Sequence, residues 1–172
     1  MILEDLGSLL IRVALGWLFL TGAWASCKDK AGRDFTVAET ALVFKWRPEL
    51  FATLGVLMLG LGGLSVLFGV FPRLGALAMA VFLVPAAMIH FAKRGQATAL
   101  RDKIGPALRG RPDAEAALNL LTTTAVFGHF TAGIKTLALI GASLYVVLAG
   151  AREPMLIGLG ADGHWHGFLT RL

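Results

Sequence analysis

The chain has 172 residues, of which 56% are hydrophobic and 16% are charged, and its formal net charge is +5. Soluble domains of this size carry about 25% charged residues, so the composition argues against a soluble globular protein. The lysines and arginines flank long apolar runs and are not interleaved with aromatic residues. This pattern favours contact with anionic lipids and argues against nucleic-acid binding. The single cysteine, Cys27, rules out an internal disulfide and a C-x-x-C redox pair.

The first apolar run, at residues 6–25, predicts a membrane-spanning helix. About 20 apolar residues are enough to cross the ~30 Å hydrocarbon core of a bilayer. Acidic Glu4 and Asp5 precede the run where a signal peptide would be basic, so we expect the run to be retained. Arg12 is the one charge inside the run. We expect it to be structural, paired with a carboxylate or with backbone carbonyls, with snorkelling to the headgroups as the alternative.

Residues 26–49 form a first polar loop, in which we predict an amphipathic helix lying on the membrane surface. Asp34 is expected to cap this helix, and Val37 and Phe44 are expected on its apolar face. Pro48 is expected to end it, because proline cannot continue a helix from within.

Two further spans are predicted at residues 50–71 and 74–91. The first is rich in glycine, and small residues let helix backbones approach closely in a membrane, so we expect it at the centre of the bundle. The short Pro72-Arg73 connection makes the two spans antiparallel neighbours. Pro85 lies inside the second of these spans and is expected to kink it.

A second polar loop is predicted at residues 92–129 and a fourth span at residues 130–149. The apolar stretch that contains this span is too long for a single crossing as one straight helix. We therefore predict a break at Gly128 or Gly133, preceded by an interfacial or partly inserted helix at residues 114–127.

The predicted fold is an all-α membrane protein with one domain over residues 1–172. It is a four-transmembrane-helix bundle with additional interfacial amphipathic helices and a loop-like tail at residues 150–172. Most lysines and arginines lie in the two long loops. The positive-inside rule therefore places these loops in the cytoplasm and both termini on the opposite side, and the expected location is a bacterial inner membrane.

Residues with ionisable or aromatic side chains converge on the loop-side end of this bundle, because successive spans alternate in direction. They are Trp24, Cys27, Lys28, Glu49, His90, His129 and Lys135. We place the candidate ligand site at this apolar mouth, and Arg12 and Glu49 are candidates for structural ion pairs.

Lys135 and His90 carry most of this hypothesis. Lys135 lies inside the fourth span, where it either binds an anionic or carbonyl group or snorkels to the headgroups. His90 is a candidate proton carrier, donor to a quinone-type carbonyl or haem ligand, and the alternative is an interfacial helix-end histidine. His129 allows the same roles with less support. His164 and His166 do not complete a metal site, so no metal is predicted.

Several short patterns recur in a fixed order along the chain. The first span has an early arginine at Arg12, a glycine at Gly16 and a lysine after the helix at Lys28. The second and third spans join through an F-P-R-L turn, and the third ends at His90. The fourth span reads I-K-T-L-A-L, and the tail contains Gly160-Ala161-Asp162.

This ordered set resembles the DoxX/DoxD-like family of integral membrane proteins. The resemblance implies a small membrane subunit of a redox complex, linked to quinone-dependent sulfur or thiol oxidation, with no intrinsic cofactor and with electrons supplied by a partner subunit. It implies that Lys135 and His90 donate to quinone carbonyls and that Trp24 packs on the ring. Members often carry an acidic residue in the second span, whereas here only Glu49 opens it, which argues against a proton relay.

The same fold also serves non-enzymatic roles. An assembly factor, a lipid binder or a cargo receptor for other membrane proteins is the main alternative, and a small transporter is a weaker one. The expected partners are membrane lipids and other redox subunits, and a homo-oligomer is an open alternative.

Overall fold

The computed structural model describes residues 2–149, and within this range it contains helices but no strand. The elements are α1 (Ile2–Cys27), α2 (Lys30–Thr40), α3 (Pro48–Phe68), α4 (Pro72–Ile104), the short 3₁₀ helix η1 (Gly105–Leu108) and α5 (Pro112–Ala149). Four helices, α1, α3, α4 and α5, are long and apolar enough to cross a membrane. The predicted all-α, four-span membrane fold is therefore confirmed. The predicted tail lies outside the described residues.

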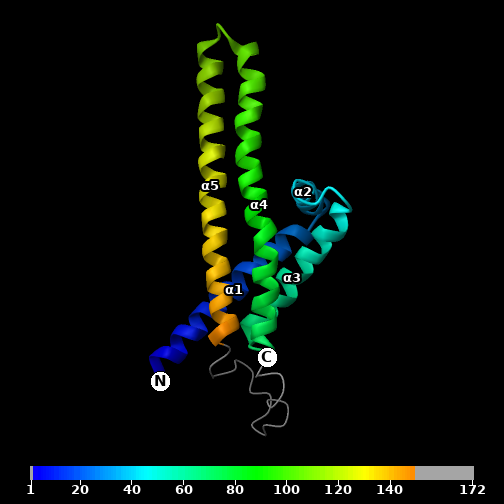
Figure 1. Cartoon of the computed structure of the whole chain (residues 1–172), viewed down its shortest axis with the longest axis vertical. Helices are drawn as coiled ribbons and strands as arrows, with labels where there is room; N and C mark the ends of the chain where they lie inside the picture. The colour runs from blue at the N-terminus through cyan, green and yellow to red at the C-terminus, as the bar shows by residue number, and fades with distance from the viewer. Residues whose placement is uncertain (1, 150–172) are drawn as a thin grey trace.

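In Figure 1, α4 and α5 form one long hairpin, and α1 runs obliquely across the other long helices toward α2. α3 packs between α1 and α4, and α4 packs along α5 as its antiparallel neighbour, whereas α1 and α5 touch over only a small area. α2 lies at the N-terminal end of α3, beside α4 (Figure 1). One face of α5 is therefore left without a packing partner among residues 2–149.

Glycines bring α1, α3 and α4 close together. A Cβ at Gly16 of α1 would lie 2.9 Å from the carbonyl oxygen of Gly63, and a Cβ at Gly63 would lie 3.1 Å from that of Gly16. On the other side of α3, a Cβ at Gly62 would lie 2.9 Å from the carbonyl oxygen of Gly75. The glycine-rich span is thus central, as expected, because only residues without side chains allow these backbones to meet.

The surface helix begins earlier than predicted. Asp29, not Asp34, is the N-cap of α2, and its carboxylate accepts a hydrogen bond of 2.7 Å from the amide of Gly32. Asp34 lies inside the helix, where it forms an ion pair with Lys30 one turn earlier. Pro48 occupies the first turn of α3, where its missing amide costs no hydrogen bond, so it starts the next helix and does not end α2.

The predicted loop at residues 92–129 is mostly helical. α4 continues to Ile104, and α5 runs without a break from Pro112 through Gly128 and Gly133. Polar residues at 93–113 did not require a loop, because a helix that leaves the membrane can carry them in water, and the helix predicted at residues 114–127 is part of α5. Gly133 is buried under the ring of Phe91, so it serves packing rather than a break.

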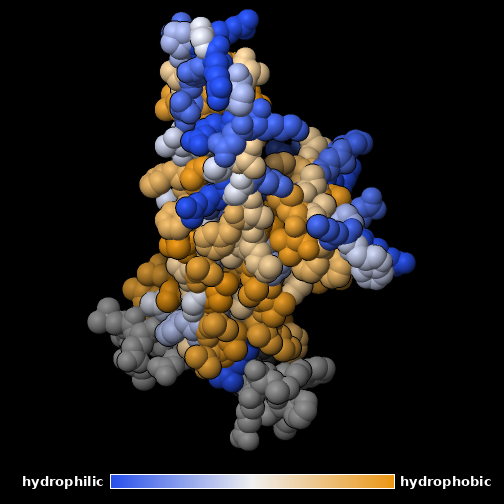
Figure 2. Space-filling view, turned by 45° about the horizontal axis from the view of Figure 1, so that its top comes forward, coloured by the Kyte–Doolittle hydropathy of each residue, from blue (hydrophilic) through white to orange (hydrophobic). Residues whose placement is uncertain are grey.

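The α4–α5 hairpin is longer than a membrane is thick. At 1.5 Å per residue, the 38 residues of α5 extend for roughly 57 Å, against ~30 Å of hydrocarbon. Hydrophobic residues cover the lower body of the molecule, and hydrophilic residues gather toward the hairpin end (Figure 2). The end of the hairpin therefore stands outside the bilayer, on the side where α2 lies.

Candidate functional site

A cavity of about 550 Å³ lies beneath α2, between the end of α1 and the facing sides of α3 and α4. Three local features form the cavity. Asp29 starts α2 directly after α1, and Arg47, whose backbone is in the left-handed conformation, turns the chain into α3. Gly55 has no side chain and so leaves room for the ring of Phe82. A cavity of this size accommodates a small organic molecule.

The walls of the cavity are mainly apolar and aromatic. The rings of Phe44 and Phe51 stack with centroids 4.2 Å apart and planes within 10° of each other. Phe82, Met58 and Ile89 line the opposite walls on α3 and α4. Flat aromatic walls of this kind bind planar apolar groups.

A few polar side chains interrupt this apolar lining, and the most informative is His90. Its Nδ1 atom is buried and has no hydrogen-bond partner among residues 2–149. Thr36 and Thr40 also line the cavity, but their hydroxyls donate to the carbonyls of Gly32 and Thr36 at 2.8 Å each. A buried polar atom without a partner is costly. His90 is thus a lining residue of the cavity with one unpaired nitrogen.

An ion pair holds α2 over the cavity. Glu39 of α2 lines the cavity and accepts from the ammonium of Lys93 on α4, and both side chains are mostly buried. The same ammonium lies 4.9 Å from the centroid of the Phe35 ring. α2 is thus tied to α4 through one cation, which closes the polar end of the cavity.

The structure brings together only some of the residues that we predicted to converge. The rings of His90 and His129 lie side by side, with centroids 6.0 Å apart, so this part of the prediction agrees with the structure. Lys135 does not enter the bundle: it lies on the exposed face of α5, and it does not line the cavity. The reason is that α5 packs mainly on α4, which buries Gly133 and Thr136 and leaves Lys135 outside, as its snorkelling alternative requires.

Trp24, Lys28 and Glu49 also lie outside the cavity lining. Trp24 is 70% exposed at the end of α1, where it suits an interfacial anchor better than a stacking platform. Lys28 is exposed beside Asp29, and Glu49 is exposed in the first turn of α3, where its charge favours the helix N-terminus. His164 and His166 lie outside the described residues, within which no cluster of three metal-ligating side chains occurs.

Arg12 is structural and does not reach the cavity. Its side chain is 1% exposed, and its Nε donates to the carbonyl oxygen of Val66 at 3.1 Å, near the end of α3. Its guanidinium lies against Gly69, whose positive φ of 73° ends that helix. Arg12 was expected to pair with a carboxylate or with backbone carbonyls, and in the structure it binds a backbone carbonyl, that of Val66.

Sequence reasoning missed Glu39 and Lys93. Glu39 fell within the predicted surface helix but was given no role, and Lys93 was assigned to the second polar loop, whereas the structure places them on α2 and α4. The signal was present: with Asp29 as the cap, Gly32, Thr36 and Thr40 recur every four residues, and Phe35 and Glu39 do the same on the adjoining face. That spacing predicts one helix face that covers a site.

Comparison with known protein families finds a match for one region of the chain. A family model described as DoxX matches residues 7–92. Every residue that lines the cavity lies between Ala25 and His90, so the whole cavity falls inside the matched region. Neither the curated proteins nor the solved structures give a match to this chain.

Proposed function

This chain belongs to the DoxX family of membrane proteins, and on that premise we propose that its cavity binds a quinone as part of a redox complex. In this proposal the protein is a small integral subunit that holds the quinone. A partner subunit, active in sulfur or thiol oxidation, supplies the electrons.

The observation that carries this proposal is the pairing of aromatic walls with the unpartnered Nδ1 of His90. A quinone has a planar apolar ring and carbonyl oxygens that accept hydrogen bonds, so its chemistry fits these walls and this atom. A purely apolar ligand would fit the walls but would leave the buried nitrogen unpaired. The lining therefore favours a planar ring that carries a hydrogen-bonding group, as a quinone does with its carbonyls.

In this proposal the polar and aromatic side chains around the cavity each have a defined role. When bound, a quinone accepts two electrons and two protons on reduction to the quinol. His90 donates from Nδ1 to one carbonyl and orients the ring between Phe82 and the stacked pair Phe44 and Phe51. Glu39 contributes the carboxylate that the second span lacks, and its pair with Lys93 keeps water from the polar end. Lys135, Trp24 and Lys28 have no part in this revised site.

Replacing His90 with alanine is expected to weaken quinone binding about 10-fold, because one hydrogen bond worth about 1.4 kcal/mol is lost. The measurement is a titration of the full-length protein in lipid nanodiscs with decylubiquinone, followed by quenching of tryptophan fluorescence. His90→Asn keeps a side-chain donor and is expected to recover part of the affinity.

Two variants serve as matched controls. His129→Ala removes the neighbouring imidazole, and Lys135→Ala removes the exposed ammonium of α5, and neither residue lines the cavity. Both are expected to bind decylubiquinone within about twofold of the wild type, since neither change removes a contact to the ligand. The proposal fails if the wild type shows no saturable binding, or if His90→Ala binds as well as the wild type.

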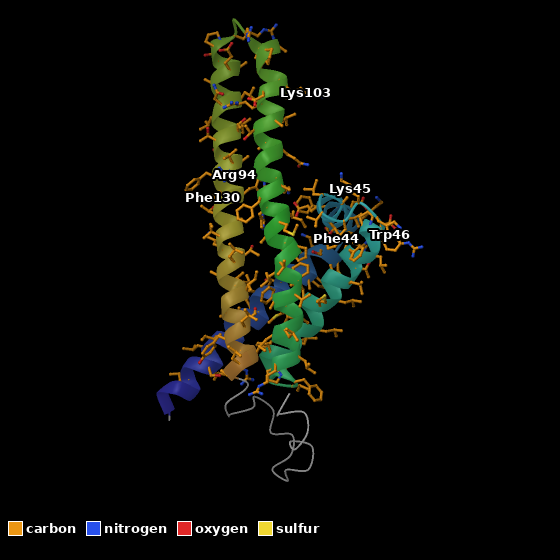
Figure 3. All side chains as sticks on the ribbon, viewed as in Figure 1. Phe44, Lys45, Trp46, Arg94, Lys103 and Phe130 are labelled. Carbon is orange, nitrogen blue, oxygen red and sulfur yellow. The ribbon has the colours of Figure 1, made fainter. Side chains whose placement is uncertain are left out.

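We further propose that the α2 side of the molecule faces the cytoplasm of a bacterial inner membrane. The support is the charge distribution. Lys45 and Arg47 at the α2–α3 turn, with Lys93, Arg94 and the basic residues of the hairpin, all lie on this side. Figure 3 shows Lys45 beside Trp46 near the level of Arg94. Trp46 is exposed and its ring lies 4.9 Å from the guanidinium of Arg47, as at a membrane interface.

Cys27 reports this orientation directly, because it is the one cysteine of the chain and lies exposed at the α2 end of α1. A membrane-impermeant maleimide is expected to label it in inverted inner-membrane vesicles and to leave it unlabelled in right-side-out vesicles. Permeabilised right-side-out vesicles, which should label fully, control for reactivity. Labelling of intact right-side-out vesicles would reverse the proposed orientation.

A further inference from the structure

An apolar seam with a seven-residue repeat runs along the exposed face of α5. One set of positions is Leu120, Phe127, Ile134, Gly141 and Leu148, and the second set, three residues further on, is Thr123, Phe130, Leu137 and Leu144. Every member of both sets is exposed. A repeat of this period, kept over four heptads, is the pattern by which helices pack along one another as coiled coils.

Lipid covers only the lower part of this α5 seam. The ~30 Å of hydrocarbon takes about 20 residues of a helix, which places residues 130–149 of α5 inside the membrane. Leu120 lies ten residues beyond, or about 15 Å outside the hydrocarbon. Leu120 is 69% exposed and Phe127 67% exposed. Because α4 carries Arg101, Asp102 and Lys103 along the same hairpin end, this end lies in water, and only protein can cover the seam there.

The hairpin end projects beyond the rest of the bundle as the continuation of α4 and α5 (Figure 3). Lys103 lies far above the level of Trp46 and Lys45 at the α2–α3 turn (Figure 3). Arg94 of α4 has its guanidinium 5.2 Å from the ring centroid of Phe130 on α5, where the hairpin leaves the bundle (Figure 3). The hairpin beyond this point lies outside residues 7–92, the region that the family model matches.

The residues beside the α5 seam allow a second copy to pack on it. The flanking positions toward the α4 side are Asn119, Val126, Gly133, Ile140 and Val147, and those on the other side are Thr124, Thr131, Ala138 and Tyr145. None of these is a lysine, arginine, histidine, aspartate or glutamate, and the exposed Lys135 lies outside both sets of seam positions. Two identical seams therefore meet without repulsion between like charges within the seam, and a charged partner finds no complementary group there. Gly141 adds a place for close approach, because a Cβ there would meet nothing within 4 Å among the described residues.

We propose that the α5 seam is a homodimer interface, in which α5 of a second copy packs parallel to the first around a two-fold axis. The membrane gives both copies the same orientation, so a dimer with this axis along the membrane normal must pair each seam residue with its own counterpart. The dimer leaves the two cavities apart from each other, because α4 lies between the cavity and α5.

Cysteine crosslinking in native membranes tests this arrangement with the full chain. Leu120→Cys in a Cys27→Ser background is expected to form a disulfide-linked dimer under copper-phenanthroline oxidation. Leu100→Cys is the matched control: Leu100 is 56% exposed on α4, and the pairing of His90 with His129 places it near the height of Leu120. The dimer yield of Leu120→Cys is expected to exceed that of Leu100→Cys at least tenfold.

A second variant gives an independent readout. Leu120→Asp combined with Phe127→Asp puts two negative charges on each seam, so the seams of two copies should repel each other. We expect the detergent-solubilised protein to shift from dimer to monomer, as measured by light scattering. Decylubiquinone binding should stay unchanged, since neither residue lines the cavity. Equal crosslinking at Leu120 and Leu100, a crosslink to a different protein, or a wild type that is monomeric would each overturn the homodimer, whatever the outcome for quinone binding.

Discussion

Replacing Arg12 with alanine is expected to lower the free energy of unfolding by about 3 kcal/mol, because a charged donor is lost and a cavity remains. The Arg12 guanidinium is buried between α1 and the end of α3, where it donates to the carbonyl of Val66 and lies against Gly69. Its charge also suits the negative end of the α3 dipole. The measurement is unfolding in mixed micelles by titration with dodecyl sulfate, followed by circular dichroism.

The control for this prediction is Arg101→Ala. Arg101 is exposed at the hairpin end and pairs with the adjacent Asp102, a contact worth little in water, so its loss should change stability by less than about 0.5 kcal/mol. Arg12→Lys keeps the charge but loses the planar fork, and we expect it to recover only part of the lost stability. An Arg12→Ala protein as stable as the wild type would show that the buried guanidinium does not hold α1 to α3.

Gly16→Ala is expected to destabilise the protein by about 2 kcal/mol, because an added methyl group cannot be accommodated where α1 crosses α3. A Cβ at Gly16 would lie 2.7 Å from the Cβ of Leu67 and 2.9 Å from the carbonyl oxygen of Gly63, so one helix must move away. Unfolding in mixed micelles measures the loss, and the weakened α1–α3 contact should also lower quinone affinity, since the end of α1 forms part of the cavity wall.

Gly60→Ala is the matched substitution on the same pair of helices. A Cβ at Gly60 would lie 3.8 Å from the Cβ of Ala23, an ordinary van der Waals distance. Alanine also favours a helix over glycine by up to about 1 kcal/mol, so Gly60→Ala is expected to be neutral or stabilising. If Gly16→Ala and Gly60→Ala changed stability equally, close approach of the backbones would not explain the Gly16 effect.

How well the sequence could locate the candidate site depended on how well it predicted where the helices end. From the sequence alone, His90 and His129 were expected at one end of the bundle, and the structure places them side by side. Polar residues at 93–113 led to a predicted loop, because a membrane pattern gives no reason to continue a helix beyond the bilayer. The structure makes this segment a helical hairpin, and that change brings Lys93 against Glu39. Neither residue could be linked to the site without that geometry.

The position of Lys135 on α5 also could not be placed from the sequence alone. Its position four or five residues inside a span is visible in the sequence, and the cost of burying its charge argued for a partner in the bundle interior. Which face of α5 is buried, however, depends on which helices surround it. Because α5 packs mainly against α4, Lys135 falls on the exposed face together with the apolar seam.

By itself the sequence determined the class of fold, the four membrane-spanning helices, the central place of the glycine-rich helix and the family, because hydropathy, helix length and small-residue spacing act locally along the chain. The tertiary structure alone decided the cavity, its cover by α2 and the exposed face of α5. These features depend on contacts between residues far apart in the chain, such as Lys93 with Glu39 and Arg12 with Val66, and no local pattern specifies which helices will face each other.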